Sequence, residues 1–241
     1  EGEWLKALRA AIEAQKADDY PAAVTHYQAA VAAGVPVEHQ LGVATNLGLA
    51  LHRAGRPAEA VGMFDRILKA QPSNGDAHHN RGSSLYALGR YEEALQAYAA
   101  AVEIDPSDGV SHFGRGNAAD KLGNHDLAVE AFGAVVRLDA TDADALYNQA
   151  NALKSSGRYD EALEVYERTL KLAPANAAAH TNVGFSLDML GRHSEAAASF
   201  LKGISLDADD AVAFSGLGAA LKATGATAES AAAYRRAIEM E

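Results

Sequence analysis

An internal repeat with a period of 34 residues runs through most of this chain of 241 residues. When the sequence is cut every 34 residues from position 41, glycine occupies the fifteenth place of each block: Gly55, Gly89, Gly123, Gly157, Gly191 and Gly225. A fixed period is typical of repeat architectures, in which each unit buries its apolar face only against its neighbours. We therefore expect a row of similar units rather than one closed domain.

Seven blocks account for almost the whole sequence. Three residues precede the first block, three more (38–40) separate it from the second, and the last block stops three residues short. The predicted repeats form a single array over 1–241 and comprise residues 4–37, 41–74, 75–108, 109–142, 143–176, 177–210 and 211–241.

Other columns of the alignment predict two helices in each block. Positions 8 and 20 hold small residues, which let two helices cross closely. An aromatic ring at position 24 fills the space between one helix pair and the next. Glycine at position 15 supplies a left-handed residue that ends the first helix, and proline at position 32 of several blocks prevents the second helix from continuing. The ring column is Phe64, Tyr98, Phe132, Tyr166, Phe200 and Tyr234.

Composition supports an all-α chain and opposes several functions. Alanine, the strongest helix former, is abundant, and aromatic residues make up only 7% of the chain. The absence of cysteine excludes disulfides and cysteine-bound metals. A net charge of −11 opposes binding to nucleic acid, and no apolar stretch is long enough for direct membrane insertion. We expect a soluble cytoplasmic or organellar compartment rather than secretion, because no signal-peptide pattern opens the chain.

The repeat columns resemble those of the tetratricopeptide repeat family. The block Gly75–Asp108 carries the family's pattern most fully, with Gly82, Leu85, Gly89, Tyr91, Ala94, Tyr98, Ala101 and Pro106. The resemblance implies an all-α, right-handed superhelix in which the first helix of each repeat lines a concave groove. In relatives, that groove holds peptide segments of partner proteins.

Side chains at the positions that the resemblance places in the groove are the candidate binding residues. Position 6 is asparagine in four blocks, and Gly114 and Gly216 interrupt that column. An amide both donates and accepts hydrogen bonds, and the column is similar to the asparagine ladder of O-linked N-acetylglucosamine transferases. The alternatives are that these asparagines are merely tolerated polar residues and that the nearby rings pack between repeats. The candidates are Asn46, His79, Asn80, Tyr86, Phe113, Asn117, Tyr147, Asn148, Asn151, Lys154, Asn182 and Phe185.

One ligand class of the family is disfavoured. Relatives that capture the C-terminal carboxylate of chaperones place lysine, lysine and arginine at set groove positions of three successive repeats. Here Phe113, Ala178 and Asn182 stand at those three places. A clamp for the chaperone carboxylate is therefore not expected.

No enzyme, metal or cofactor signature is found. No two of the nine histidines lie three or four residues apart, so no helix face carries a histidine pair for zinc. The favoured hypothesis is a non-catalytic scaffold that binds an extended partner segment, a protein or peptide, in the groove.

Two alternatives remain open. The chain could be the substrate-presenting arm of a larger enzyme such as a glycosyltransferase, or a self-assembling structural module. Tyr234 and Ile238 on the last helix should face a missing neighbour. We therefore expect the chain to continue past Glu241, or a partner to cover that flank.

Overall fold

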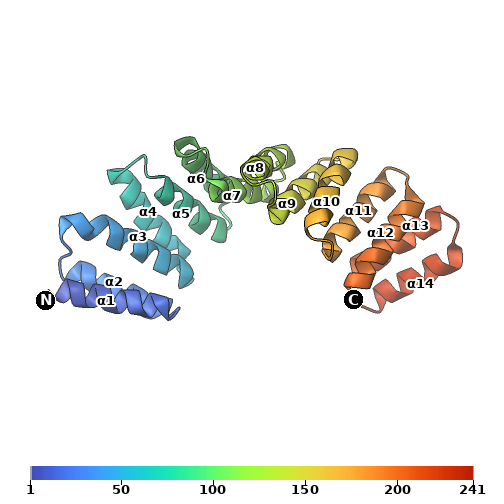
Figure 1. Cartoon of the computed structure of the whole chain (residues 1–241). Helices are drawn as coiled ribbons and strands as arrows, with labels where there is room; N and C mark the ends of the chain where they lie inside the picture. The colour runs from blue at the N-terminus through green and yellow to red at the C-terminus, as the bar shows by residue number, and fades with distance from the viewer. Residues whose placement is uncertain (1, 241) are drawn as a thin grey trace. The chain divides into compact units, whose positions relative to one another are not determined.

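The computed structural model describes residues 2–240, and over these residues it consists of fourteen α-helices with no strand (Figure 1). The fourteen helices, with no strand among residues 2–240, confirm the all-α prediction. Odd-numbered helices are the first helices of the blocks and even-numbered helices are the second. The helices are α1 (Glu3–Lys16), α2 (Tyr20–Ala32), α3 (Val37–Arg53), α4 (Pro57–Ala70), α5 (Gly75–Ala87), α6 (Tyr91–Ile104), α7 (Gly109–Lys121), α8 (His125–Leu138), α9 (Ala143–Ser155), α10 (Tyr159–Leu172), α11 (Ala177–Met189), α12 (His193–Leu206), α13 (Ala211–Ala223) and α14 (Thr227–Ile238).

The helices form two compact units, one ending at Leu122 and the other beginning at Gly123. In each unit, consecutive helices pack against each other. First helices of successive repeats also contact one another: α3, α5 and α7 in the first unit, and α9, α11 and α13 in the second. We call the surface formed by these helices the first-helix face of each unit. That the seven repeats form one continuous array stays a prediction.

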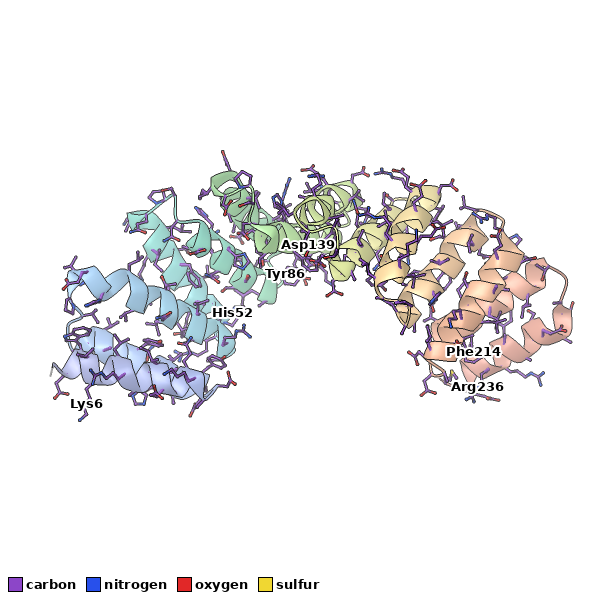
Figure 2. The ribbon with its side chains drawn as sticks, in the orientation of Figure 1. Lys6, His52, Tyr86, Asp139, Phe214 and Arg236 are labelled. Atoms are coloured by element: carbon purple, nitrogen blue, oxygen red, sulfur yellow. The ribbon has the colours of Figure 1, made fainter. Side chains whose placement is uncertain are left out.

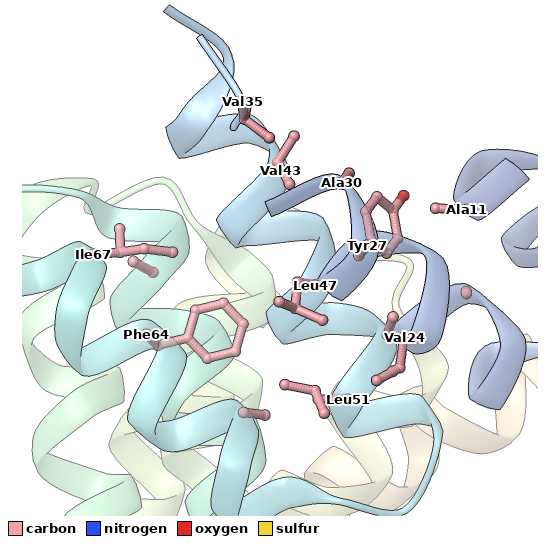
Figure 3. Close-up of a cluster of buried hydrophobic side chains, with 14 residues drawn as sticks. Ala11, Val24, Tyr27, Ala30, Val35, Val43, Leu47, Leu51, Phe64 and Ile67 are labelled. Atoms are coloured by element: carbon pink, nitrogen blue, oxygen red, sulfur yellow. The ribbon is translucent and has the colours of Figure 1, made fainter. Parts of the chain in front are cut away.

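The aromatic ring of each repeat requires a small residue on the first helix of the same repeat. A Cβ atom added to Gly48 would lie 2.7 Å from the ring of Phe64, and one added to Gly184 would lie 2.8 Å from the ring of Phe200. Both rings are fully buried. Figure 3 shows the first such core, in which Leu47 lies between the rings of Phe64 and Tyr27. The small residue at position 8 therefore accommodates a ring as well as a close helix crossing.

The column of glycines ends each first helix as predicted. Gly157, for example, has a φ of 78°, a left-handed conformation that glycine adopts without strain. The next amide, that of Arg158, then donates to the carbonyl of Leu153 at 2.9 Å and caps the helix. In the first repeat Asp18 takes this role with a φ of 55°. Aspartate is among the few other residues that tolerate this region.

Three repeats carry a histidine contact that the repeat columns did not predict. The histidine Nε2 atom donates to the carbonyl oxygen of the proline six residues earlier, because a carbonyl can only accept. Where alanine replaces that proline, at Ala140 and Ala208, the residue six positions later is Leu146 or Phe214 instead of histidine. These histidines are therefore structural. The pairs are His78 with Pro72 at 2.9 Å, His112 with Pro106 at 3.1 Å, and His180 with Pro174 at 3.2 Å.

Replacing His180 with leucine should lower the free energy of unfolding by about 0.5–1.5 kcal/mol, because one hydrogen bond is lost. Urea denaturation followed by circular dichroism measures the change. His26→Leu is the control, since the His26 ring makes no hydrogen bond in the described part of the chain. Equal effects of the two changes would contradict a structural role for the proline contact.

Candidate functional site

All twelve candidate residues lie on first helices, and each is partly buried. Figure 2 labels one of them, Tyr86 on α5, and also His52 on α3. None of the twelve is fully enclosed in a core, so their side chains remain partly accessible. They are distributed as Asn46 on α3; His79, Asn80 and Tyr86 on α5; Phe113 and Asn117 on α7; Tyr147, Asn148, Asn151 and Lys154 on α9; and Asn182 and Phe185 on α11.

Two asparagines of the position-6 column use their amide nitrogens within their own helix. Asn80 Nδ2 donates to the Asp76 carbonyl at 2.8 Å, and Asn148 Nδ2 donates to the Asp144 carbonyl at 2.9 Å. Their Oδ1 atoms accept no hydrogen bond from the described residues. Each of these amides therefore offers its oxygen as an acceptor and keeps one of its two N–H donors.

The two glycines that interrupt the column lie directly against a ring. A Cβ atom on Gly114 would lie 2.5 Å from the ring of Tyr98, and one on Gly216 would lie 2.5 Å from the ring of Phe200. In both cases the ring comes from the preceding repeat and occupies the space that a side chain would need.

His79 belongs to a hydrogen-bonded chain between α5 and α7. The buried Ser111 hydroxyl donates to the Asp108 carboxylate, so His79 Nδ1 must donate to Ser111 Oγ, at 2.9 Å. The Tyr98 hydroxyl donates to Ser83 at 3.1 Å, and Ser83 faces His79 Nε2 at 3.5 Å. His79 is thus a neutral part of the packing in the first unit.

Stability should decrease in mild acid because of His79. Burial lowers the pKa of His79 below its ordinary value of 6.5, although Asp108 and Asp76 act in the opposite direction. The neutral form is therefore favoured by folding. Its contribution is complete above about pH 6.5 and is lost as the pH falls from there towards the lowered folded-state pKa. Melting temperatures between pH 5 and 8 should fall towards acid, and less steeply in His79→Phe; identical slopes would contradict this role.

Tyr86 also has a structural contact. Its ring meets the ring of Tyr91 edge-on, with centroids 5.1 Å apart. This favours the packing interpretation for Tyr86. For Asn46 and Asn117 the described structure contains no side-chain hydrogen bond.

The second unit brings five of the twelve candidates together on its first-helix face. Tyr147, Asn151 and Lys154 lie on one side of α9 at intervals of four and three residues, and Asn182 and Phe185 face them from α11. We call these five residues the α9–α11 cluster. Lys154 Nζ donates to Asn182 Oδ1 at 2.6 Å and lies 6.0 Å from the centre of the Phe185 ring.

The lysine fixes the orientation of both amides. An ammonium group only donates, so Asn182 must direct its oxygen at Lys154 and its nitrogen at the other side of the cluster. Asn182 Nδ2 then donates to Asn151 Oδ1 at 3.0 Å and to the Tyr147 hydroxyl at 3.1 Å. Asn151 Nδ2 consequently points away from Asn182. No described residue accepts a hydrogen bond from it.

Two buried aromatic residues, Tyr166 and Phe200, contact side chains of the cluster. The fully buried Tyr166 donates its hydroxyl to Asn151 Oδ1 at 2.5 Å, and its ring lies 6.2 Å from that of Tyr147. Burial raises the pKa of Tyr166, so this phenol remains a donor. On the other side, Phe185 packs edge-on against Phe200 at 4.9 Å. The rings at position 24 thereby hold the polar side chains in place.

Lys154 carries a charge without a counter-ion in its own unit. Its Nζ has no carboxylate within 4 Å among residues 123–240, and its polar partner is a neutral amide. Burial lowers the pKa of Lys154 from its ordinary value of 10.5. An ammonium group in this position is stabilised less well than an exposed one.

A hollow in the first unit is lined by none of the twelve candidates. The helix α3 has 17 residues where α5 has 13, because Val37 and the three inserted residues 38–40 extend its first turn. The extension borders a hollow of about 670 Å³ whose lining includes the exposed Val31, Val37 and Leu41. The insertion was visible in the sequence, but the hollow was not predicted.

Residues 2–240 also lack the features of a metal site and of a membrane span. That part of the chain contains no group of three histidine or acidic side chains placed to hold a metal ion. None of its helices combines the length and apolarity needed to cross a membrane.

Comparison with known sequences identifies the repeat. A sequence model described as tetratricopeptide repeat matches residues 45–109, 113–177 and 147–211. The chain belongs to the tetratricopeptide repeat family. None of the curated proteins searched matches it significantly.

Solved tetratricopeptide repeat structures share the fold. A tetratricopeptide repeat protein from Parabacteroides merdae has a TM-score of 0.73 at 20% identity, over 100% of this chain and 94% of its own. YrrB, described as having an unusual peptide-binding site, has a TM-score of 0.69 at 21% identity, over 73% of this chain and 91% of its own. MamA from Desulfovibrio magneticus has a TM-score of 0.66 at 22% identity, over 70% and 96%.

Proposed function

We propose that this protein is a non-catalytic interaction scaffold that binds an extended segment of a partner protein on the first-helix face. The α9–α11 cluster is the observation that carries the proposal. It combines partly buried rings, amides and a lysine on two adjacent first helices, and several of its polar groups have no partner in the described structure.

The face offers both kinds of hydrogen-bonding group to a peptide backbone. Asn80 and Asn148 present Oδ1 acceptors, each fixed by a bond of its own Nδ2 to the preceding turn. Asn151 presents an Nδ2 donor, fixed through Asn182 and Lys154. Side chains that are already oriented lose little conformational entropy on binding. An extended segment, whose amides and carbonyls are unpaired, matches such a surface.

Family membership and the peptide-binding relative support this proposal. Tetratricopeptide repeats expose a row of first helices, and YrrB is described as a peptide-binding member. The chaperone-carboxylate clamp remains disfavoured for this chain, because Phe113, Ala178 and Asn182 replace its three cations.

Selection of peptides by the intact chain tests the proposal. Random segments displayed within a loop, and therefore without a free C-terminus, are enriched on the immobilised protein. The selected segments are then measured against two double variants. Asn148→Ala with Asn182→Ala should weaken binding, because Asn148 no longer bonds the segment, a loss of about 0.5–1.5 kcal/mol, and Asn182 no longer orients Asn151 and Lys154. Glu167→Ala with Lys171→Ala, on the exposed surface of α10, should leave the affinity unchanged.

The reverse pattern would overturn the proposal. Loss of binding in the α10 variant, with full affinity in the asparagine variant, would place the partner on the second helices. Circular dichroism of both variants checks that the fold is retained.

A further inference from the structure

The α9–α11 cluster has more hydrogen-bond donors than its own acceptors use. Asn182 Oδ1 accepts from Lys154, Asn151 Oδ1 accepts from both Asn182 and Tyr166, and the Tyr147 oxygen accepts from Asn182. Each acceptor oxygen is therefore already engaged. The groups left without a partner among the described residues are the two remaining N–H bonds of Lys154, the N–H bonds of Asn151 and the hydroxyl hydrogen of Tyr147. All of these are donors.

These unused donors belong to side chains grouped around one carboxamide. Lys154, at 2.6 Å, lies at the oxygen of Asn182, whereas Asn151, at 3.0 Å, and Tyr147, at 3.1 Å, lie at its nitrogen. A carboxylate that pairs with Lys154 is therefore bound next to two further donor side chains. It would also supply the counter-ion that the partly buried Lys154 lacks within its own unit.

The surroundings favour a side chain within a segment over a chain terminus. First-helix surface continues past the cluster on α13, which contacts α11, so a bound segment need not stop there. The cluster holds one cation, and one carboxylate neutralises it. The net charge of −11 repels strongly acidic segments and favours a single acid among neutral or basic residues.

We propose that the α9–α11 cluster binds the side-chain carboxylate of one aspartate or glutamate within an extended partner segment. This inference rests on the proposed function and adds the chemical class of residue that the face selects. In it, Lys154 supplies the charge, whereas Asn151 and Tyr147 orient the carboxylate. Phe185 borders the site and limits access of water to the ion pair.

A charge reversal with a matched control tests the inference on the full chain. Display selections are run on the unmodified protein, on Lys154→Glu and on Lys222→Glu. Lys222 stands at the same repeat position as Lys154, but it is exposed on α13 and makes no side-chain contact with the cluster. The unmodified protein and Lys222→Glu should enrich one acidic position, and Lys154→Glu should enrich lysine or arginine there instead.

Synthetic peptides then give the size of the effect. Exchanging the selected glutamate for glutamine should weaken binding about tenfold on the unmodified protein, the range for a hydrogen bond to a charged group, and should not weaken it on Lys154→Glu. Blocking the C-terminus as an amide should have no effect. Should Lys154→Glu fail to fold by circular dichroism, Lys154→Gln replaces it and should abolish the acid preference.

The possible failures are distinguishable. The selected segments could depend on Asn148 and Asn182 and yet show no acid preference, or show one that Lys154→Glu leaves intact. Either result would overturn this inference but would still agree with the proposed scaffold function. A requirement for a free C-terminal carboxylate would also overturn it, in favour of a terminal clamp. Failure to select any segment would overturn the proposed function and this inference together.

Discussion

Replacing Tyr166 with alanine should lower the free energy of unfolding by about 3–5 kcal/mol, the range for removal of a buried aromatic side chain. The Tyr166 ring is fully buried between two repeats, and its hydroxyl donates to Asn151. The substitution removes the packing of the ring and leaves a cavity beneath the α9–α11 cluster. Urea denaturation followed by circular dichroism measures the loss.

Tyr166→Phe separates the two contributions of this residue. The ring remains and the hydroxyl is lost, so stability should fall by only about 0.5–1.5 kcal/mol. Asn151 Oδ1 keeps its bond from Asn182, and the cluster should persist. A loss in Tyr166→Ala no larger than in Tyr166→Phe would contradict the view that this ring carries the packing.

Two glycine-to-alanine changes should have opposite signs. At Gly216 the new Cβ would lie 2.5 Å from the buried ring of Phe200, and relieving that overlap should cost about 1–3 kcal/mol. At Gly62, within α4, a Cβ meets no atom within 4 Å, and alanine should stabilise the helix by about 0.8–1 kcal/mol. The two substitutions are chemically identical, so helix propensity alone cannot explain a difference in sign.

Thermal and urea unfolding of both variants measure this pair. Stabilisation by Gly216→Ala would mean that the Phe200 ring moves aside easily.

The regular parts of the fold were predictable because each structural requirement recurs as the same residue type at the same position of several repeats. Gly157 and its equivalents marked the end of each first helix, and the column containing Tyr166 marked the ring between repeats. The reason for position 8 was only partly foreseen. Helix crossing predicts a small residue there, and the structure adds that the ring of the same repeat lies against it, as Phe64 does against Gly48.

The candidate site was predicted as a set of positions but not as an arrangement. Lys154 and Asn182 come from different repeats and different columns, so no single column indicated that they touch. Likewise, periodicity does not show that the Asn148 amide nitrogen donates to the Asp144 carbonyl of its own helix. Such contacts depend on how individual side chains orient within a helix and between neighbouring first helices, which the repeat pattern of residue types does not specify.

Site-specific photo-crosslinking tests the central claim most directly. A benzophenone amino acid replaces Phe185 on the first-helix face or, as a matched position, the half-exposed Leu172 on α10. Each protein is irradiated with a segment selected on the unmodified chain. The account predicts a crosslink from position 185 that excess unlabelled segment suppresses, and none from position 172. A crosslink from position 172 alone would show that the partner binds the second helices, contrary to the account.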